Sequence, residues 1–327
     1  FYKVGNEWKV NVVRDVLTTP TTGYASFRVL DFRTQAYFDY IKVRVYAPLT
    51  VNDTTFTKRN FLDHATYSAY TAFTTVENGF KITPEELKAA ITPKTKMFLF
   101  SSPCNPSGAV YSKAELEALA EVFKQYPDIY IISDEIYEYI NYVGKHESIA
   151  QFSELKERVI LINGLSKGFA MTGWRLGYIA ANIEIAKACD KLQGQFTSAT
   201  CSITQKAAIA ALTGDLTPSL AMTAEFAERK KLTLALIKEI PGISCSDPDG
   251  AFYVFPDVSS FYGKSDGTTT ITNANDFCMY LLNTAHVSSV MGDAFGEPDC
   301  VRFSYANSQE NIKKAWVRVK DALLKLK

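Results

Sequence analysis

The stretch over residues 164–177 reads GLSKGFAMTGWRLG and determines how the rest of the chain is interpreted. Its lysine, Lys167, follows the apolar run 159–163, which we interpret as a buried strand. A lysine in a confined, partly apolar loop can lose its proton and form an imine with an aldehyde. Arg175 follows, and its guanidinium suits a phosphate dianion. Alone, this pair more often means an ordinary surface lysine on a loop.

Working outward from this stretch, strand-like and helix-like segments alternate from about residue 77. Short apolar runs at 97–101 and 129–133 are typical of buried strands, and 177–181 is a shorter candidate. Thr83 and Ser112 each precede a glutamate by three residues, and this capping-box spacing predicts the start of a helix. The alternation predicts an α/β fold with a mostly parallel central sheet and helices on both faces.

The later part of the chain predicts a long helical region and then a smaller α/β unit. Helical patterns cover 186–212 and 219–240, and we expect Gly214 and Pro218 to separate these two helices. Further strands are expected near 252–255 and 300–305, with a closing helix from about Gln309. We therefore expect three parts: an N-terminal region, a large domain and a small C-terminal domain, over residues 1–76, 77–215 and 216–327.

The segment SDEIY at residues 133–137 directly follows the run 129–133. Asp134 is therefore expected near the carboxyl end of a strand, where open α/β sheets bind ligands. A carboxylate there can keep an aromatic ring nitrogen protonated, and Tyr137 can hydrogen-bond a phenolic oxygen. Read alone, a capping aspartate and a core tyrosine are the commoner explanation.

Two further polar residues stand in informative places. Asn105 lies in the segment SPCNPSG after the run 97–101, where N-P-S-G by itself is only a turn signal. Arg302 lies between apolar residues in VRFSY, and a buried arginine usually has an anionic partner. That partner is either a ligand carboxylate or a side chain within the protein.

Together, these four ordered motifs resemble those of class I pyridoxal-phosphate-dependent aminotransferases of the aspartate aminotransferase type, over about residues 77–327. The resemblance implies the fold-type-I α/β architecture. It implies that Lys167 carries pyridoxal 5'-phosphate as a Schiff base and later moves the substrate α-proton. It also implies that Asp134 binds the ring nitrogen and that Tyr137 and Asn105 bind the phenolic oxygen.

The resemblance assigns three more contacts and an activity. Arg175 and Ser166 would bind the phosphate, and Arg302, with Asn105, would bind the substrate. The expected enzyme is a homodimer with shared active sites that transfers an amino group from an amino acid, aspartate favoured, to 2-oxoglutarate. Alternatives are an aminotransferase for aromatic or aliphatic amino acids or a β-C–S lyase on the same scaffold. A regulator with an aminotransferase-like domain is a remote alternative.

The composition of the chain argues against several other classes of protein. Apolar and charged residues make up 47% and 21% of the chain, and 35 basic residues balance 35 acidic ones. This balance gives no electrostatic signature for nucleic acid, and no apolar run is long enough for a membrane span. The six scattered cysteines and three histidines have no metal-ligand spacing. We expect buried thiols, no metal and a cytoplasmic protein.

Residues 1–76 do not match the family clearly. They show no recognisable small-residue turn that could bind a phosphate with backbone N–H groups, and no clear aromatic residue to stack on a cofactor ring. The segments around Gly23, Arg28 and Tyr67 resemble family segments only faintly. We expect that the true N-terminal part is longer than, or different from, these residues. An intact mass near 36.4 kDa would contradict that expectation.

Overall fold

The computed structural model describes residues 2–4, 7–9 and 78–327. The chain divides into two compact units, residues 1–64 and 65–327. In the first unit, β1 (Tyr2–Val4) pairs antiparallel with β2 (Glu7–Lys9). The segments around Gly23, Arg28 and Tyr67 lie outside the described residues. The site and both sheets discussed below belong to the second unit.

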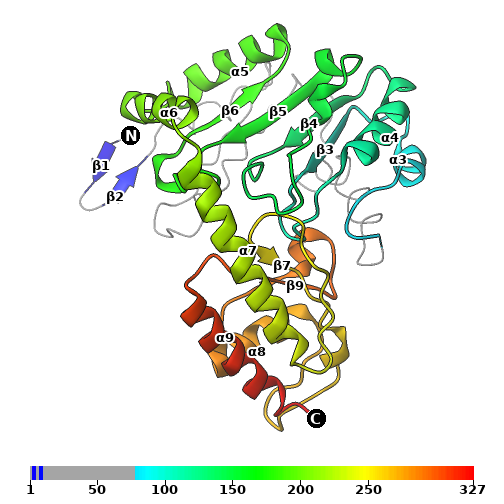
Figure 1. The fold of residues 1–327 in the computed structure, drawn as a ribbon, viewed down its shortest axis with the longest axis vertical. Coiled ribbons are helices and arrows are strands. Elements are labelled where there is room, and N and C mark those ends of the chain that lie inside the picture. The colour runs from blue at the N-terminus through cyan, green and yellow to red at the C-terminus, as the bar shows by residue number, and fades with distance from the viewer. Residues whose placement is uncertain (1, 5–6, 10–77) are drawn as a thin grey trace. The chain divides into compact units, whose positions relative to one another are not determined.

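A four-stranded sheet forms the frame of the second unit (Figure 1). Its strands are β3 (Met97–Ser101), β4 (Tyr130–Asp134), β5 (Val159–Gly164) and β6 (Gly177–Ala180), in that spatial order. The first three are parallel, and β6 is antiparallel to β5. The carboxyl ends of β3, β4 and β5 therefore meet at one edge, and the predicted α/β fold with a mostly parallel sheet is confirmed.

Two capped helices pack beside β3. They are α3 (Pro84–Ala90) and α4 (Lys113–Lys124), and both begin with the predicted capping box. The Ser112 side chain accepts from the backbone N–H of Glu115, and the Glu115 carboxylate accepts from that of Ser112. Helix α4 then buries Leu116 and Leu119 in the first core, because the two positions share one face of the helix.

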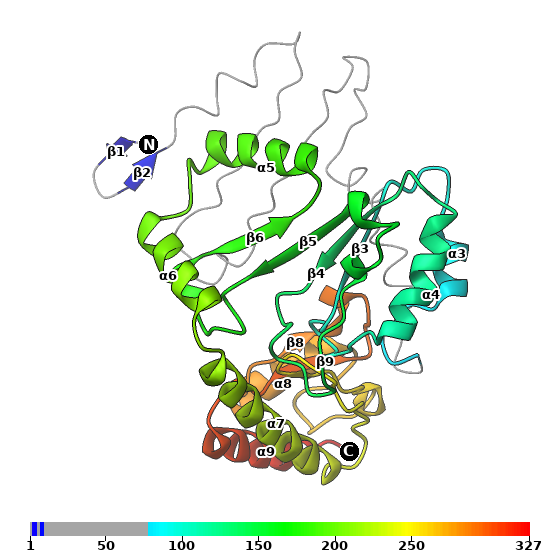
Figure 2. The ribbon, with the colours of Figure 1, turned by 45° about the horizontal axis from the view of Figure 1, so that its top comes forward.

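The helical region consists of three helices, so the prediction of one helix over 186–212 was wrong. The helices are α5 (Ile183–Phe196), α6 (Ser202–Thr213) and α7 (Thr217–Lys238), and α5 runs alongside β6 (Figure 2). Ser198 has φ of 65°, which a right-handed helix cannot contain, so the first helix ends before it. Pro218 does not separate helices but lies in the first turn of α7, where a missing N–H costs nothing.

A three-stranded antiparallel sheet and two helices form the rest of the second unit. The sheet order is β7-β9-β8, with β7 (Tyr253–Val254), β8 (Val290–Met291) and β9 (Val301–Ser304). Helices α8 (Ala274–Ala285) and α9 (Gln309–Leu323) surround a second core with α7, which lies beside α9 in both views (Figures 1 and 2). Short 3₁₀ helices occupy Ile149–Gln151, Lys156–Arg158, Thr172–Trp174, Ser259–Phe261 and Gly292–Phe295.

Two expectations about burial were wrong in part. Among the described strands, β3 lies at the edge of its sheet, and Met97 and Leu99 on one of its faces are 40% and 51% exposed. Cys189 and Cys201 are exposed as well, because they lie on α5 and at the start of α6 rather than in a core. Within the described residues, no helix combines the length and the apolar character that a bilayer span requires.

Candidate active site

Three predicted site residues lie where β3, β4 and β5 end. Asn105 follows β3, Asp134 is the last residue of β4, and Lys167 follows β5. Asp134 pairs in register with Ser101 of β3 and with Ile162 of β5. The parallel order therefore brings residues from three separate segments to one edge of the sheet, which is where ligands bind in open α/β sheets.

The loop around Lys167 is held by backbone hydrogen bonds. The N–H of Met171 donates to the carbonyl of Leu165 at 3.1 Å, and that of Ala170 donates to the Lys167 carbonyl at 3.1 Å. Lys167 Nζ lies 5.7 Å from the centre of the Tyr137 ring and 5.8 Å from that of Phe252. The lysine amine is thus directed toward aromatic side chains rather than into bulk solvent.

Asp134 has a partly buried carboxylate with few partners. Its Oδ1 accepts from the backbone N–H of Ile136 at 3.1 Å. Burial raises the pKa of Asp134, and the nearby Glu135 raises it further, whereas the Ile136 N–H and the Lys167 charge lower it. The first two effects prevail, so a cation from a ligand would stabilise this carboxylate.

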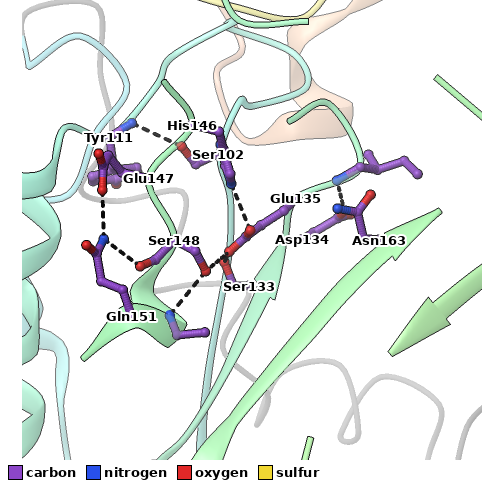
Figure 3. Close-up of polar contacts among 12 residues, drawn as sticks. Ser102, Tyr111, Ser133, Asp134, Glu135, His146, Glu147, Ser148, Gln151 and Asn163 are labelled. Carbon is purple, nitrogen blue, oxygen red and sulfur yellow. Dashed lines mark hydrogen bonds and ion pairs between the residues drawn. The ribbon is translucent and has the colours of Figure 1, made fainter. Parts of the chain in front are cut away.

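Beside Asp134, the fully buried Glu135 forms a network that we did not predict (Figure 3). Its carboxylate accepts from Ser133 Oγ at 2.8 Å and from Ser148 Oγ at 2.6 Å, and lies 2.7 Å from His146 Nε2. With Glu138, Glu135 and His146 place potential metal-ligand atoms within 4.8 Å of one another. Sequence spacing gave no sign of this group, because His146 enters it from a separate loop.

Tyr137 is buried, and its hydroxyl lies 2.9 Å from the hydroxyl of Tyr253 on β7. Burial, followed by the neighbouring Tyr253 hydroxyl, raises the pKa of Tyr137, so the phenol keeps its proton. From the sequence, Tyr253 was predicted only to lie in a strand near 252–255. Nothing in the local pattern indicated that it would reach a tyrosine 116 positions away.

Arg302 lies on β9, and one of its guanidinium nitrogens donates to Asn105 Oδ1 at 2.7 Å. The guanidinium carbon lies 4.7 Å from the centre of the Tyr253 ring and 5.0 Å from that of Phe295. Within the described residues, no carboxylate forms a salt bridge with Arg302.

The two predicted phosphate contacts lie on the loop between β5 and β6. The Ser166 carbonyl accepts from Thr172 Oγ1 at 2.7 Å. Arg175 is exposed, and its guanidinium donates to the Thr172 carbonyl at 3.0 Å. Both residues therefore form hydrogen bonds with Thr172, and their roles toward a phosphate remain predictions.

Lys167 and the Asp134 carboxylate thus lie at the carboxyl edge of a mostly parallel sheet, and Arg302 of the second sheet binds Asn105, which follows β3 at the same edge. The family model for aminotransferase class I and II matches residues 60–319, and the chain belongs to this family. The predicted family is thereby confirmed.

Within the family, the chain is similar to enzymes named for aspartate. It is 43% identical over 261 residues to the bifunctional aspartate aminotransferase and glutamate/aspartate-prephenate aminotransferase of Petunia hybrida, covering 78% of this chain and 54% of the relative. It is 45% identical over 246 residues to the aspartate aminotransferase of Bacillus subtilis, covering 75% and 61%. The crystal structure of the aspartate aminotransferase from Rhizobium meliloti superposes with a TM-score of 0.75 at 40% identity, covering 77% and 64%. The chain thus spans between about half and two thirds of the length of these proteins.

Proposed function

We propose that this chain carries the active site of a pyridoxal-phosphate-dependent aminotransferase, with Lys167 as the residue that holds the cofactor covalently. The observation that supports this most is the meeting of Lys167, Asp134 and Tyr137 at one edge of the sheet, across from Arg302. The family depends on pyridoxal phosphate in general, and the similar relatives are named for aspartate.

The chemistry of these residues fits the cofactor. Asp134 is a carboxylate whose pKa is raised by burial and which needs a cationic partner. A protonated ring nitrogen is such a partner. Tyr137 is a phenol that keeps its proton and can donate it to a phenolic oxygen, and Asn105 has a carboxamide nitrogen for the same oxygen. For the phosphate, we propose Arg175 and Ser166.

The cofactor, when bound, supplies an electron sink for the charge left at the substrate α-carbon. The chain supplies the rest. Lys167 Nζ takes the α-proton as a general base and returns it as a general acid. The Asp134 carboxylate stays ionised and keeps the ring nitrogen charged. Phe252 and Tyr137 flank Lys167 and limit the access of water to its amine.

Arg302 is proposed to bind the substrate α-carboxylate. Its planar fork suits bidentate pairing, and Asn105 and two aromatic rings already orient it. With aspartate as the favoured donor, aspartate and 2-oxoglutarate give oxaloacetate and glutamate, so that one amino group moves and no ammonia is released. From the resemblance we further infer a cytoplasmic homodimer with shared active sites and a domain boundary near residues 215 and 216.

The test is the visible absorption spectrum of the full-length protein before and after addition of aspartate. We expect a cofactor band that aspartate shifts, with oxaloacetate formed in a single turnover and glutamate formed once 2-oxoglutarate is present. A band that shifts only with aromatic or aliphatic amino acids would favour the alternative aminotransferases, and release of ammonia would favour the lyase. If no band forms even with added pyridoxal phosphate, the proposed function is wrong.

A further inference from the structure

We propose that Tyr253 is a positioning residue that acts on Tyr137 and on Arg302 at the same time. The inference rests on the proposed function. Tyr253 itself lies on β7, in the small antiparallel sheet, and is 7% exposed. It is therefore placed to connect a residue that follows β4 of the large sheet with an arginine on the neighbouring strand β9.

The hydroxyl contact determines which way the Tyr137 proton points. The two phenol oxygens lie 2.9 Å apart, and each has one proton and two lone pairs. If Tyr137 donates to Tyr253, its proton is engaged in a hydrogen bond within the protein and is not available to a ligand. If Tyr253 donates to Tyr137, the Tyr137 proton is free for an acceptor in the site, and the incoming bond polarises its O–H group. Once the phenolic oxygen of the cofactor is present as an acceptor for the Tyr137 proton, Tyr253 has to donate to Tyr137, and Tyr137 is then a stronger donor to that oxygen than it would be without Tyr253.

The ring contact keeps Arg302 in place. The guanidinium carbon lies 4.7 Å from the centre of the Tyr253 ring and 5.0 Å from that of the Phe295 ring. Contact with the two rings restricts rotation of the planar group, and their π faces attract its charge. Because Asn105 accepts one N–H of the guanidinium, the remaining N–H groups are left to a carboxylate.

One side chain therefore serves two functions that can be separated by mutation. Tyr253→Phe removes the hydroxyl and keeps the ring, so it should affect Tyr137 and spare Arg302. Tyr253→Leu removes both. Tyr305→Phe is a matched control, because Tyr305 is also buried and its hydroxyl also contacts another tyrosine hydroxyl, that of Tyr142, at 3.2 Å. In the described part of the chain, no hydrogen bond or ring contact joins Tyr305 to Tyr137 or Arg302.

Two readouts on the protein loaded with pyridoxal phosphate test the proposal. The first is the pH midpoint of the visible absorption of the bound cofactor. A donor to the phenolic oxygen favours its negatively charged form, so a weaker donor should move this midpoint to higher pH. We expect Tyr253→Phe to raise the midpoint by a few tenths of a pH unit, and Tyr305→Phe to leave it unchanged.

The second readout is the binding of maleate, a dicarboxylate without an amino group. We expect Tyr253→Phe to bind it within about twofold of wild type, and Tyr253→Leu to bind it roughly 2- to 30-fold more weakly, as loss of a cation–π contact implies. An unchanged pH midpoint in Tyr253→Phe, or a shift equal to that of Tyr305→Phe, would overturn the hydroxyl role. Equal maleate binding by the Phe and Leu variants would overturn the ring role.

The wild type separates this inference from the proposed function. If the wild type takes up the cofactor and reacts with aspartate while the Tyr253 variants behave like Tyr305→Phe, only the role of Tyr253 fails. If the wild type takes up no cofactor, the proposed function fails and this inference fails with it.

Discussion

Asp134 ends β4 with a partly buried carboxylate, and burial raises its pKa above the ordinary value of about 3.9. The folded protein therefore binds this proton more tightly than the unfolded chain does. Stability decreases as the pH rises from the ordinary pKa through the raised one, and the loss persists at neutral pH. The Asp134 carboxylate thus makes the ligand-free protein less stable at neutral pH.

The first prediction concerns the stability of Asp134→Asn without cofactor. We expect this variant to unfold at higher denaturant concentration than wild type at neutral pH, because the amide still accepts from Ile136 N–H without a buried charge. The advantage should vanish below pH ~3.9, where the wild-type carboxyl is protonated in both states. Urea unfolding across this pH range measures it. If the variant were less stable than wild type at neutral pH, the interpretation that the Asp134 carboxylate destabilises the ligand-free protein would be wrong.

The second prediction concerns the activity of the same position. Asp134→Asn and Asp134→Ala leave a buried ring cation unpaired, so we expect a loss of about 3–5 kcal/mol in transition-state stabilisation. Asp134→Glu keeps the charge and should lose less. Values of kcat/KM for aspartate compare the three variants, and equal losses in the Glu and Ala variants would contradict the ion-pair role.

The third prediction separates the chemistry of Lys167 from cofactor binding. Lys167→Ala should abolish amino transfer, because Lys167 is the one lysine among residues 165–176, which connect β5 and β6. It should still bind pyridoxamine phosphate, which has no aldehyde and therefore needs no lysine. Enzyme assays and thermal unfolding with this compound measure the two properties. Normal turnover in Lys167→Ala would refute the assignment.

At the scale of elements, the turn after β3 places Asn105 by close backbone packing. Gly108 has φ of 73°, and its carbonyl accepts from the N–H of Gly250 at 2.8 Å. A Cβ at Gly108 would lie 2.4 Å from Pro248 Cβ and 2.7 Å from the Gly250 carbonyl oxygen. Only a glycine therefore lets the two segments approach so closely.

The fourth prediction compares two glycines with similar backbone conformation. Gly79→Ala, at φ of 65° with nothing within 4 Å of the added Cβ, should cost only the left-handed strain of about 1–2 kcal/mol. Gly108→Ala adds a clash worth roughly a further 1–3 kcal/mol and displaces Asn105. Unfolding free energies and the KM for aspartate measure both effects. If the two variants lost equal stability and had the same KM, the close packing at Gly108 would contribute neither to stability nor to the position of Asn105.

For the molecule as a whole, local sequence patterns predicted helices and strands better than they predicted contacts between distant residues. The capping boxes and the strands before Asp134 and Lys167 were found because caps, loops and alternation of apolar residues are encoded within a few positions. The break at Ser198 was missed, since residues 197–201 contain neither proline nor glycine, and Gly194, the nearest glycine, lies inside α5. The polar residues at the break compete with the helix only weakly. The contact from Tyr137 to Tyr253 was missed because it depends on the tertiary fold.

The residues of the candidate site come from two parts of the fold, and each part has its own hydrophobic core. The first core contains Leu119 and belongs to the four-stranded sheet, and the second contains Trp316 and belongs to the three-stranded sheet. Backbone hydrogen bonds connect the two parts, including one from Ala251 N–H to the Ile140 carbonyl at 2.8 Å. Ligands that contact residues of both parts should therefore stabilise both parts together.

The fifth prediction tests this connection with one cavity in each core. Leu119→Ala and Trp316→Ala should each cost about 2–5 kcal/mol, because both side chains are buried. If the site joins the cores, each variant unfolds in a single thermal transition, and pyridoxal phosphate at 100 times its Kd stabilises both variants by about 2.7 kcal/mol. Calorimetry with and without the cofactor measures this. If Trp316→Ala showed a separate early transition that the cofactor did not shift, the three-stranded part would unfold independently, and the contacts of Tyr253 and Arg302 with the large sheet would contribute little to binding.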